Sequence, residues 1–291
     1  MRKVVITTDS TSDLSNELLK KYEIYTIPLY VRFGEEIYKD GVDLNTLELY
    51  KKVKEKNELP KTMAVSPGDF EEFFKSFLIK DCDIVHISIG SKISGSYQSA
   101  VLASQLLDEN RVFVVDSQNL SSGIALLALK GKDFRDQGLD AKTIKKELDK
   151  LVLNVRSQFV IKTMDYLYKG GRASGLQALF GTMLKIRPII QVRDGILNVY
   201  KKPLGRLKKG YDIMLEDFFN EGNNLDLDYV MITHSLNDEG AKYMMEKVKE
   251  KVKVKNLIES HAGCVISSHC GEGTIGILYI VKNWKDYYVW F

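Results

Sequence analysis

Short apolar runs without a helical period alternate with amphipathic segments along the first half of the chain. Runs of this kind cover residues 3–8, 83–89 and 111–115, and helical patterns cover residues 123–137 and 141–155. Buried strands that alternate with helices are typical of a parallel, doubly wound sheet. We therefore expect an N-terminal α/β domain in which a parallel sheet lies between two layers of helices (α/β/α).

Each of these three runs ends in a loop of small polar residues, at residues 9–13, 90–95 and 116–122. In a doubly wound sheet, ligands bind outside the carboxyl ends of the strands. We expect the three loops to lie side by side and to form the ligand-binding edge of this domain.

The segment between the first and second of these strands is less regular. Two β-rich runs, at residues 24–33 and 35–42, flank a glycine and predict a hairpin. We then expect a helix at residues 46–57, a linker at residues 61–68 and an amphipathic helix at residues 70–78. The linker would return the chain towards the ligand-binding edge.

The pattern changes from Gln158 onwards, because strands and helices no longer alternate one to one. Asp194-Gly195 between two β-rich runs predicts a hairpin. We expect an α+β domain with a mainly antiparallel sheet, so that the two domains are residues 1–160 and 161–291. Its expected strands cover residues 159–163, 187–192, 196–200, 227–234, 257–268 and 274–281, and its expected helices cover residues 176–184, 206–220 and 239–252.

The loop at residues 90–95 contains a first candidate binding residue, Ser94. Gly90 and Gly95 allow the backbone to approach a ligand closely, the hydroxyl can donate a hydrogen bond, and the amides at a helix start favour an anion. The alternative is that Ser94 only caps the following helix on an ordinary surface loop.

Arg172 is a second candidate, because it follows two glycines in a loop-forming segment. A flexible backbone of this kind can present a guanidinium group to a carboxylate or a phosphate. The alternative is an arginine exposed on a turn, with no ligand.

The metal-like cluster in the sequence consists of His261, Cys264, His269 and Cys270. Structural metal sites usually take their ligands from two spaced pairs, whereas His269 and Cys270 are neighbours that would point to opposite faces of a strand. We expect no metal here, and instead buried cysteines beside one functional or capping histidine.

Signals for an enzyme are weak. Residues 271–276 fit G-x-G-x-x-G, but a β-rich run follows them where a nucleotide-binding helix is required, which favours a glycine turn between strands. No G-x-x-x-x-G-K-[ST] loop or kinase signature is present, so we do not expect this chain itself to bind ATP. Ser94 with His269 and either Asp9 or Asp116 could imitate a hydrolase triad, although the G-x-S-x-G elbow is missing.

The composition excludes further classes of function. With 42 Lys and Arg against 39 Asp and Glu, the net charge of +3 gives no field that would favour nucleic acid. The first apolar run is too short for a signal peptide, and no run approaches the roughly 18 residues that cross a bilayer. Three cysteines are too few for a disulfide framework. We expect a cytoplasmic protein with no nucleic-acid partner and no integral membrane segment.

Taken together, six motifs in register resemble the DegV family. They are TTDSTSDL at residues 7–14, the loop at residues 62–70 with Ser66-Pro67-Gly68, ISGSYQSA at residues 93–100, VDS at residues 115–117, YKGGR at residues 168–172, and H-x-G-x-G from His269. Members of that family are fatty-acid-binding proteins, and the best understood of them act as the lipid-carrying subunit of bacterial fatty acid kinase.

The resemblance implies a two-domain protein that buries one long-chain fatty acid between and within its domains. It places the carboxylate-binding hydroxyls at Thr62 and Ser94, next to Gly95, and the carboxylate-binding imidazole at His269. Arg172 falls on an arginine that serves activity with the kinase more than lipid binding. The resemblance further implies no catalytic residue, no metal and no cofactor on this chain, because a separate kinase subunit would supply ATP and metal.

The sequence departs from the family pattern in three places. Met63 and Ala64 replace a usual polar pair, Glu272 stands where proline is common, and a basic position near Leu204 is vacant, with Arg206 as a substitute two residues on.

The alternative function is a stand-alone serine hydrolase or small-molecule kinase that uses the same loops.

Overall fold

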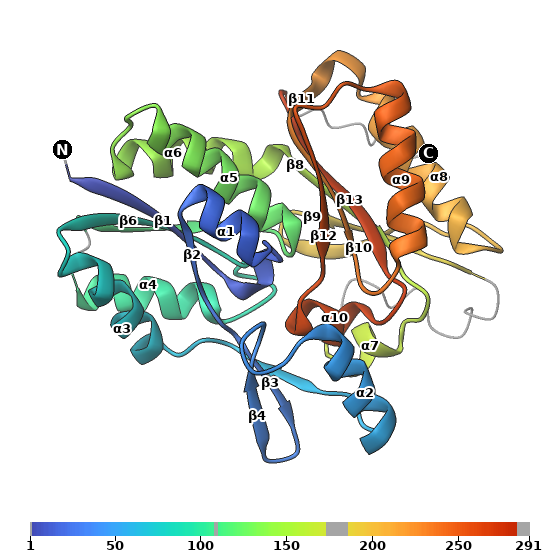
Figure 1. Ribbon diagram of the computed structural model, residues 1–291, viewed down its shortest axis with the longest axis horizontal. Coiled ribbons are helices and arrows are strands. Elements are labelled where there is room, and N and C mark those ends of the chain that lie inside the picture. The colour runs from blue at the N-terminus through green and yellow to red at the C-terminus, as the bar shows by residue number, and fades with distance from the viewer. Residues whose placement is uncertain (1, 108–109, 173–185, 284–291) are drawn as a thin grey trace.

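The computed structural model describes residues 2–107, 110–172 and 186–283 (Figure 1). The first large sheet in this part of the chain has four strands. Its strands are β1 (Lys3–Asp9), β2 (Ile24–Ile27), β6 (Cys82–Ser88) and β7 (Val112–Asp116). They pair in the order β2-β1-β6-β7, and every pairing is parallel. The helices around this sheet are α1 (Asn16–Tyr22), α3 (Pro67–Leu78), α4 (Ser96–Leu106), α5 (Ser122–Asp136) and α6 (Ala141–Leu151), and short 3-10 turns are η1 (Ser10–Ser12) and η2 (Val152–Asn154).

Alternate side chains of these strands reach opposite faces, as the period of two requires. Ile6 and Ile87 pack in the cluster that contains α5 and α6, whereas Val5 and Ile84 pack in the cluster that contains the phenylalanines of α3. The predicted parallel α/β/α domain is therefore confirmed.

The second large sheet is six-stranded and mainly antiparallel, as predicted. Its order is β10-β9-β8-β13-β11-β12, and only β11 and β12 pair in parallel. Its strands are β8 (Val155–Val160), β9 (Ile189–Arg193), β10 (Ile196–Lys201), β11 (Leu225–His234), β12 (Asn256–His261) and β13 (Ile275–Val281). The other elements of this half are α7 (Asp165–Lys169), α8 (Leu207–Asn220), η4 (Gly222–Asn224), α9 (Asp238–Lys251) and α10 (Cys264–Cys270).

Helix α5 lies between the two sheets and joins the two halves (Figure 1). Its apolar run at residues 124–129 is 0% exposed, because the same cluster contains side chains from β1 and β6 on one side and from β11 and β13 on the other. A helix that is apolar all round is typical of a buried position. Lys130, at the end of the run, binds Asp226 and Asp228 at 2.6 Å each.

The chain enters the second sheet earlier than the predicted strand at residues 159–163. Strand β8 begins at Val155, directly after η2 ends the helical region, so the predicted boundary near residue 160 lies at the end of β8. The predicted hairpin at Asp194-Gly195 is confirmed as β9–β10. The predicted helix at residues 176–184 lies outside the described residues.

A third, smaller sheet corrects two expectations. The run at residues 24–33 is divided at Pro28 into β2 and β3 (Tyr30–Phe33), which belong to different sheets, because proline has no amide hydrogen to continue a ladder. The hairpin of β3 with β4 (Glu36–Lys39) is confirmed. The expected linker at residues 61–68 contains a strand, β5 (Lys61–Met63), which pairs with β3. Helix α2 (Thr46–Lys56) connects β4 with β5, and the β3–β4 hairpin projects from the body (Figure 1).

The expected strand at residues 257–268 was wrong in its second half. Strand β12 ends at His261, and α10 begins at Cys264. The glycine turn therefore covers residues 271–274, between α10 and β13, and His269 and Cys270 lie on a helix. The amides at the start of α10 are bound by side chains from the first half of the chain, which explains why the local pattern did not predict it.

Candidate functional site

The five residues predicted to bind or present a ligand line one cavity. Thr62, Ser94, Gly95, Arg172 and His269 all contribute to its wall. The space between the protein atoms amounts to about 950 Å³, including the opening to solvent. The rest of the wall is largely apolar, with side chains from both halves of the chain, among them Leu29, Ile93, Leu120, Phe159, Leu197 and Leu278.

The three polar loops after β1, β6 and β7 lie side by side, as predicted. Asp9 Oδ2, at the end of β1, accepts a hydrogen bond from the Ile89 amide at 2.8 Å. Asp116, at the end of β7, accepts hydrogen bonds from the amide of Ser91 at 3.0 Å and from its hydroxyl at 2.6 Å. The carboxylates at the strand ends therefore fix the loop that carries Ser94.

Gly90 permits this loop to approach its neighbour. A Cβ at Gly90 would lie 3.0 Å from the Asn119 amide nitrogen, and the Gly90 amide donates to Asn119 O at 2.8 Å. Ser94 Oγ accepts a hydrogen bond from the Ser96 amide at 3.2 Å, and the two hydroxyls are 3.1 Å apart. Ser94 thus supports the start of α4 and lines the cavity at the same time.

Thr62 and His269 come from distant elements and are in direct contact. Thr62 Oγ1, on β5, lies 2.8 Å from His269 Nε2, on α10. His269 Nδ1 is buried and has no hydrogen-bond partner among the described residues. Gly170 makes room for the ring, because a Cβ there would lie 2.3 Å from Nδ1. The imidazole, which lines the cavity, therefore has unused hydrogen-bonding capacity at Nδ1, on the side that packs against Gly170.

Burial, and then the nearby charge of Arg172, lower the pKa of His269 to about 4. The ring is therefore neutral at pH 7 while the cavity is empty. Arg172 itself is half-buried, and its Nη1 donates to the Gly170 carbonyl at 2.9 Å. The guanidinium group is held by the same glycine turn that admits the histidine.

The hydrolase triad considered from the sequence is not assembled. The hydrogen bonds of Ser94 Oγ go to Ser96, and Nε2 of His269 pairs with Thr62. Asp9 is bound to Thr11, Ser88 and the Ile89 amide, and Asp116 is bound to Ser91 and the Gln118 amide. No carboxylate among the described residues orients His269.

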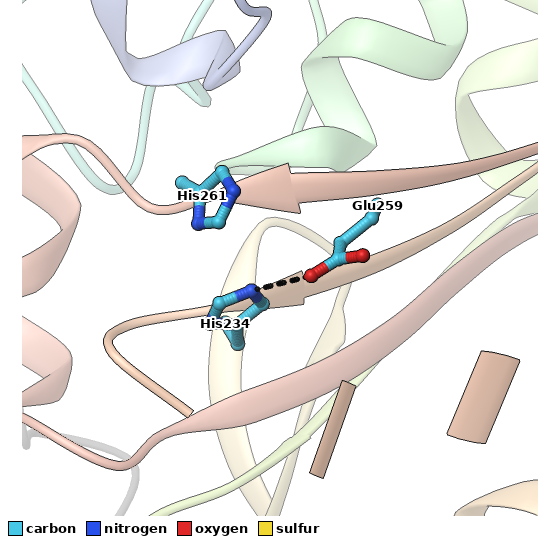
Figure 2. Close-up of side chains that lie close together, drawn as sticks. All are labelled: His234, Glu259 and His261. Atoms are coloured by element: carbon cyan, nitrogen blue, oxygen red, sulfur yellow. Dashed lines mark hydrogen bonds and ion pairs between the residues drawn. The ribbon is translucent and has the colours of Figure 1, made fainter. Parts of the chain in front are cut away.

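A further cluster was not predicted from the sequence. His234, Glu259 and His261 have potential ligand atoms within 4.8 Å of one another, and Figure 2 shows Glu259 directed at the ring of His234. The cluster depends on the parallel pairing of β11 with β12, which places His234 opposite His261. A local sequence pattern carries no signal for that pairing.

The hydrogen bonds of His234 disagree with a metal site. The Asn237 amide donates to Nδ1 at 3.0 Å, so the proton of the neutral ring is on Nε2, which lies 3.2 Å from Glu259 Oε1. A metal ion would need the lone pair of that same Nε2. Burial and the neighbouring His261 lower the pKa of His234, which favours this neutral form.

The cysteines of the predicted cluster are buried, as expected. Cys264 Sγ donates to the Leu44 carbonyl at 3.2 Å, and burial raises the pKa of its thiol. Burial also raises the pKa of Cys270 to about 12. Neither thiol forms a nucleophilic thiolate at neutral pH.

No helix in the described part of the chain is both long and apolar enough to span a bilayer.

Comparison with known proteins identifies the family. The family model described as "Uncharacterised protein, DegV family" matches residues 3–282. The chain belongs to the DegV family. A "Fatty acid-binding protein" from Thermotoga maritima is 33% identical over 282 residues, which cover 94% of this chain and 96% of that protein.

Solved structures of similar proteins have the same fold. A fatty-acid-binding DegV family protein from Thermus thermophilus has a TM-score of 0.90 at 29% identity, and the match covers 97% of this chain and 100% of that one. A stearic-acid-binding protein from Eubacterium ventriosum has a TM-score of 0.87 at 29% identity, over 97% of this chain and 99% of that one. Each of these proteins is similar to the present chain along almost its whole length.

Proposed function

We propose that this protein binds one long-chain fatty acid, with the acyl chain in the cavity and the carboxylate held by Thr62, Ser94 and His269. The observation that carries the proposal is the contact of Thr62 with His269, whose Nδ1 is buried without a partner among the described residues, in the wall of a largely apolar cavity. Membership of a family with fatty-acid-binding proteins supports it.

The apolar wall suits the acyl chain. Each methylene that moves from water into an apolar cavity gains about 0.8 kcal/mol, so a long chain gains on the order of 10 kcal/mol before the costs of ordering and association. Burial of the tail would therefore supply most of the affinity.

The polar residues suit the carboxylate. An ionised carboxylate that leaves water loses several kcal/mol of hydration and needs hydrogen-bond donors to remain charged. Thr62 and Ser94 offer hydroxyl donors, the Gly95 backbone allows a close approach, and His269 offers a ring N–H. In this role Ser94 donates a hydrogen bond and does not attack.

The proposal extends to a separate kinase. One oxygen of the bound carboxylate would attack the γ-phosphorus of ATP held by that partner, the bond to ADP would break, and an acyl phosphate would form. This chain has no phosphate-binding loop of its own, so its part would be to position the acyl group. Such a role requires no cofactor on this chain and takes place in the cytoplasm, where ATP is available.

Mass spectrometry of the purified protein tests the binding proposal. Denaturing extraction is expected to release about one fatty acid per chain from the wild type, and clearly less from His269→Ala. Absence of stoichiometric fatty acid from the wild type, after incubation with an excess of it, would contradict the proposal. Ester hydrolysis that disappears in Ser94→Ala would favour the hydrolase instead.

Arg172 separates binding from presentation. We expect Arg172→Ala to keep its fatty acid but to lose acyl phosphate formation with the kinase, while Arg187→Ala, at a partly exposed arginine whose guanidinium bonds backbone carbonyls, keeps both. Equal loss of lipid and activity in Arg172→Ala would place Arg172 in the carboxylate site.

A further inference from the structure

Two buried carboxylates from the first half of the chain hold the N-terminus of α10. Asp13 Oδ1 accepts a hydrogen bond from the Gly263 amide at 2.8 Å, and Asp40 Oδ1 accepts one from the Cys264 amide at 2.7 Å. Asp13 is 7% exposed and Asp40 is 3% exposed. We call this pair of residues, Asp13 and Asp40, the α10 clasp.

Gly263 is the position where the clasp closes on the helix. A Cβ at this residue would lie 3.1 Å from Asp40 Oδ1 and 3.2 Å from Asp13 Oδ1. These distances are shorter than ordinary van der Waals contact, so the two carboxylates approach the backbone as closely as the absence of a side chain allows.

Asp13 also holds a second part of the cavity wall. The Ser121 hydroxyl donates to Asp13 Oδ2 at 2.5 Å, and Ser121 lines the cavity with a positive φ of 52°. A positive φ is unfavourable for serine and persists only where the surroundings fix it. One carboxylate therefore fixes two wall elements, the start of α10 and the loop before α5.

Burial of the two carboxylates of the clasp opposes folding, which distinguishes the clasp from an ordinary helix cap at the surface. Burial raises the pKa of both carboxyls, and the charges of Asp40 and Asp9 raise that of Asp13 further. Only a few hydrogen bonds offset this cost, from Ser121 and Gly263 on Asp13 and from Ser10 and the α10 amides on Asp40. Carboxyls whose pKa values are raised by burial and neighbouring charge occur at functional sites as well as in structural networks, and the contacts with α10 are what give this pair its role.

The position of α10 decides where His269 stands. The helix has only seven residues, and His269 is the sixth of them, so a shift of the N-terminus moves the imidazole with it. Along the rest of α10 the described contacts with the first half include Tyr50 with the Ser267 carbonyl at 3.4 Å and Thr62 with His269. The first of these is long and weak. The clasp therefore holds the helix together with the hydrogen bond of Cys264 Sγ to the Leu44 carbonyl and the packing of Cys264 and Val265 in the apolar cluster, and it supplies the charged contacts to the helix amides.

We propose that Asp13 and Asp40 are positioning residues for the carboxylate site: they hold α10 so that His269 meets Thr62 and faces the cavity. The inference rests on the proposed function for its ligand, but the position of His269 can be measured without any ligand. Neither residue touches the fatty acid, and each acts through the helix.

The test compares Asp13→Ala, Asp40→Ala and Gly263→Ala with the wild type. Two measurements are made: the release rate of bound isotope-labelled palmitate, and the Cε1–Hε1 resonance of His269 in the ligand-free protein. Asp140→Ala is the matched control, because Asp140 binds the Thr143 amide at 2.8 Å and caps α6 away from the cavity. Asp13→Asn tests for rescue, since an amide oxygen can still accept the Gly263 hydrogen bond.

We call Asp13→Ala, Asp40→Ala and Gly263→Ala the clasp variants. In each of them we expect palmitate to be released at least about tenfold faster than from the wild type, which corresponds to roughly 1.4 kcal/mol. We also expect a shifted His269 resonance in each. Asp140→Ala should show neither change, and Asp13→Asn should lie between Asp13→Ala and the wild type. Where Asp13→Ala does not fold, Asp13→Asn and Asp40→Ala decide the question by the same two measurements.

The inference is overturned if folded clasp variants release palmitate at the wild-type rate and keep the His269 resonance, or if Asp140→Ala weakens binding equally. A wild type that binds no palmitate overturns the proposed function only. In that case, the His269 resonance and its nuclear Overhauser contact with Thr62, compared between wild type and clasp variants, decide whether the clasp positions α10.

Discussion

Thr62 Oγ1 and His269 Nε2 lie 2.8 Å apart, although 207 positions of the sequence separate them. The contact forms because β5 is added to the small third sheet while α10 packs into the apolar cluster beneath it. It joins one hydroxyl from the first half of the chain with the imidazole of the second half.

Removal of a hydroxyl from this site should weaken fatty acid binding. We expect Thr62→Val and Ser94→Ala each to lower the affinity about tenfold, because each change deletes one hydrogen bond to a buried carboxylate. Equilibrium binding of a labelled fatty acid measures the effect. Ser76→Ala is the control, since its hydroxyl donates to the Phe73 carbonyl on α3, which is not part of the cavity. Unchanged affinity in both site variants would remove these hydroxyls from the carboxylate site.

Gly170 should tolerate no side chain, because the space beside it is filled. Its backbone conformation, with φ −74° and ψ −5°, would suit any residue. A Cβ at Gly170 would lie 2.3 Å from His269 Nδ1, so Gly170→Ala is expected to displace the imidazole and to lose fatty acid. The extract of the purified variant, examined by mass spectrometry, shows the loss. In Gly68→Ala the nearest atom to the new Cβ is 3.8 Å away, and this variant should retain its ligand. Full retention by Gly170→Ala would mean that the ring position is unimportant.

Ligand binding should raise the pKa of His269. In the empty cavity burial and Arg172 lower it to about 4, and a carboxylate within hydrogen-bond distance favours the charged imidazolium. A titration of the ring resonances with and without fatty acid measures the shift. His86 is the internal control: burial lowers its pKa to about 3, and it lies outside the cavity wall. A His269 midpoint that stays near 4 in the loaded protein would contradict the assignment.

We expect the contribution of Asp9 to the free energy of unfolding to fall as the pH rises from about 4 to 6. Burial raises the pKa of Asp9 from 3.8 to about 6, so in this window the folded state binds more protons than the unfolded state. The stability contribution of Asp9 is complete below pH 3.8 and is lost as the pH rises through 6. The expected loss is roughly 3 kcal/mol at pH 7.

Urea unfolding of the wild type and Asp9→Asn at several pH values measures this dependence. The asparagine of the variant does not ionise, so the variant does not lose stability in this way. The free energy of unfolding of the variant minus that of the wild type should therefore increase from pH 4 to pH 6. Asp140→Asn should show almost no such change from pH 4 to pH 6, because hydrogen bonds to Thr143 lower the pKa of Asp140 below 3.8 and its titration lies below this window. A constant difference between Asp9→Asn and the wild type would show that Asp9 does not titrate in this range.

The regular part of the fold was predictable from local patterns. The β-rich runs that became β1, β6 and β7 end in polar loops, and the apolar run at residues 124–129 indicated a helix, although not that it is buried on all sides. Ser94 and Arg172 were predicted as binding candidates from glycines and hydroxyls alone, and both line the cavity. Thr62 was assigned only through the family resemblance, since its strand β5 has three residues and exists through pairing with β3.

The remaining features depend on partners that are remote in sequence. Helix α10 was predicted as a strand because its first amides are bound by Asp13 and Asp40, more than 200 positions away. The cluster of His234, Glu259 and His261 depends on the register of β11 with β12. Local periodicity carries no information about such contacts, so the structure was needed to find them.

The burial of α5 limits how a ligand can enter or leave the cavity. If the two halves swung apart, the apolar residues 124–129 would lose one of their two walls, at a cost on the order of 10 kcal/mol. That is comparable with the whole free energy of folding of a typical domain. Exchange must therefore take place while both halves stay attached to α5, through local movements at the mouth of the cavity, and its rate should respond to changes at the rim and not to the stiffness of a hinge.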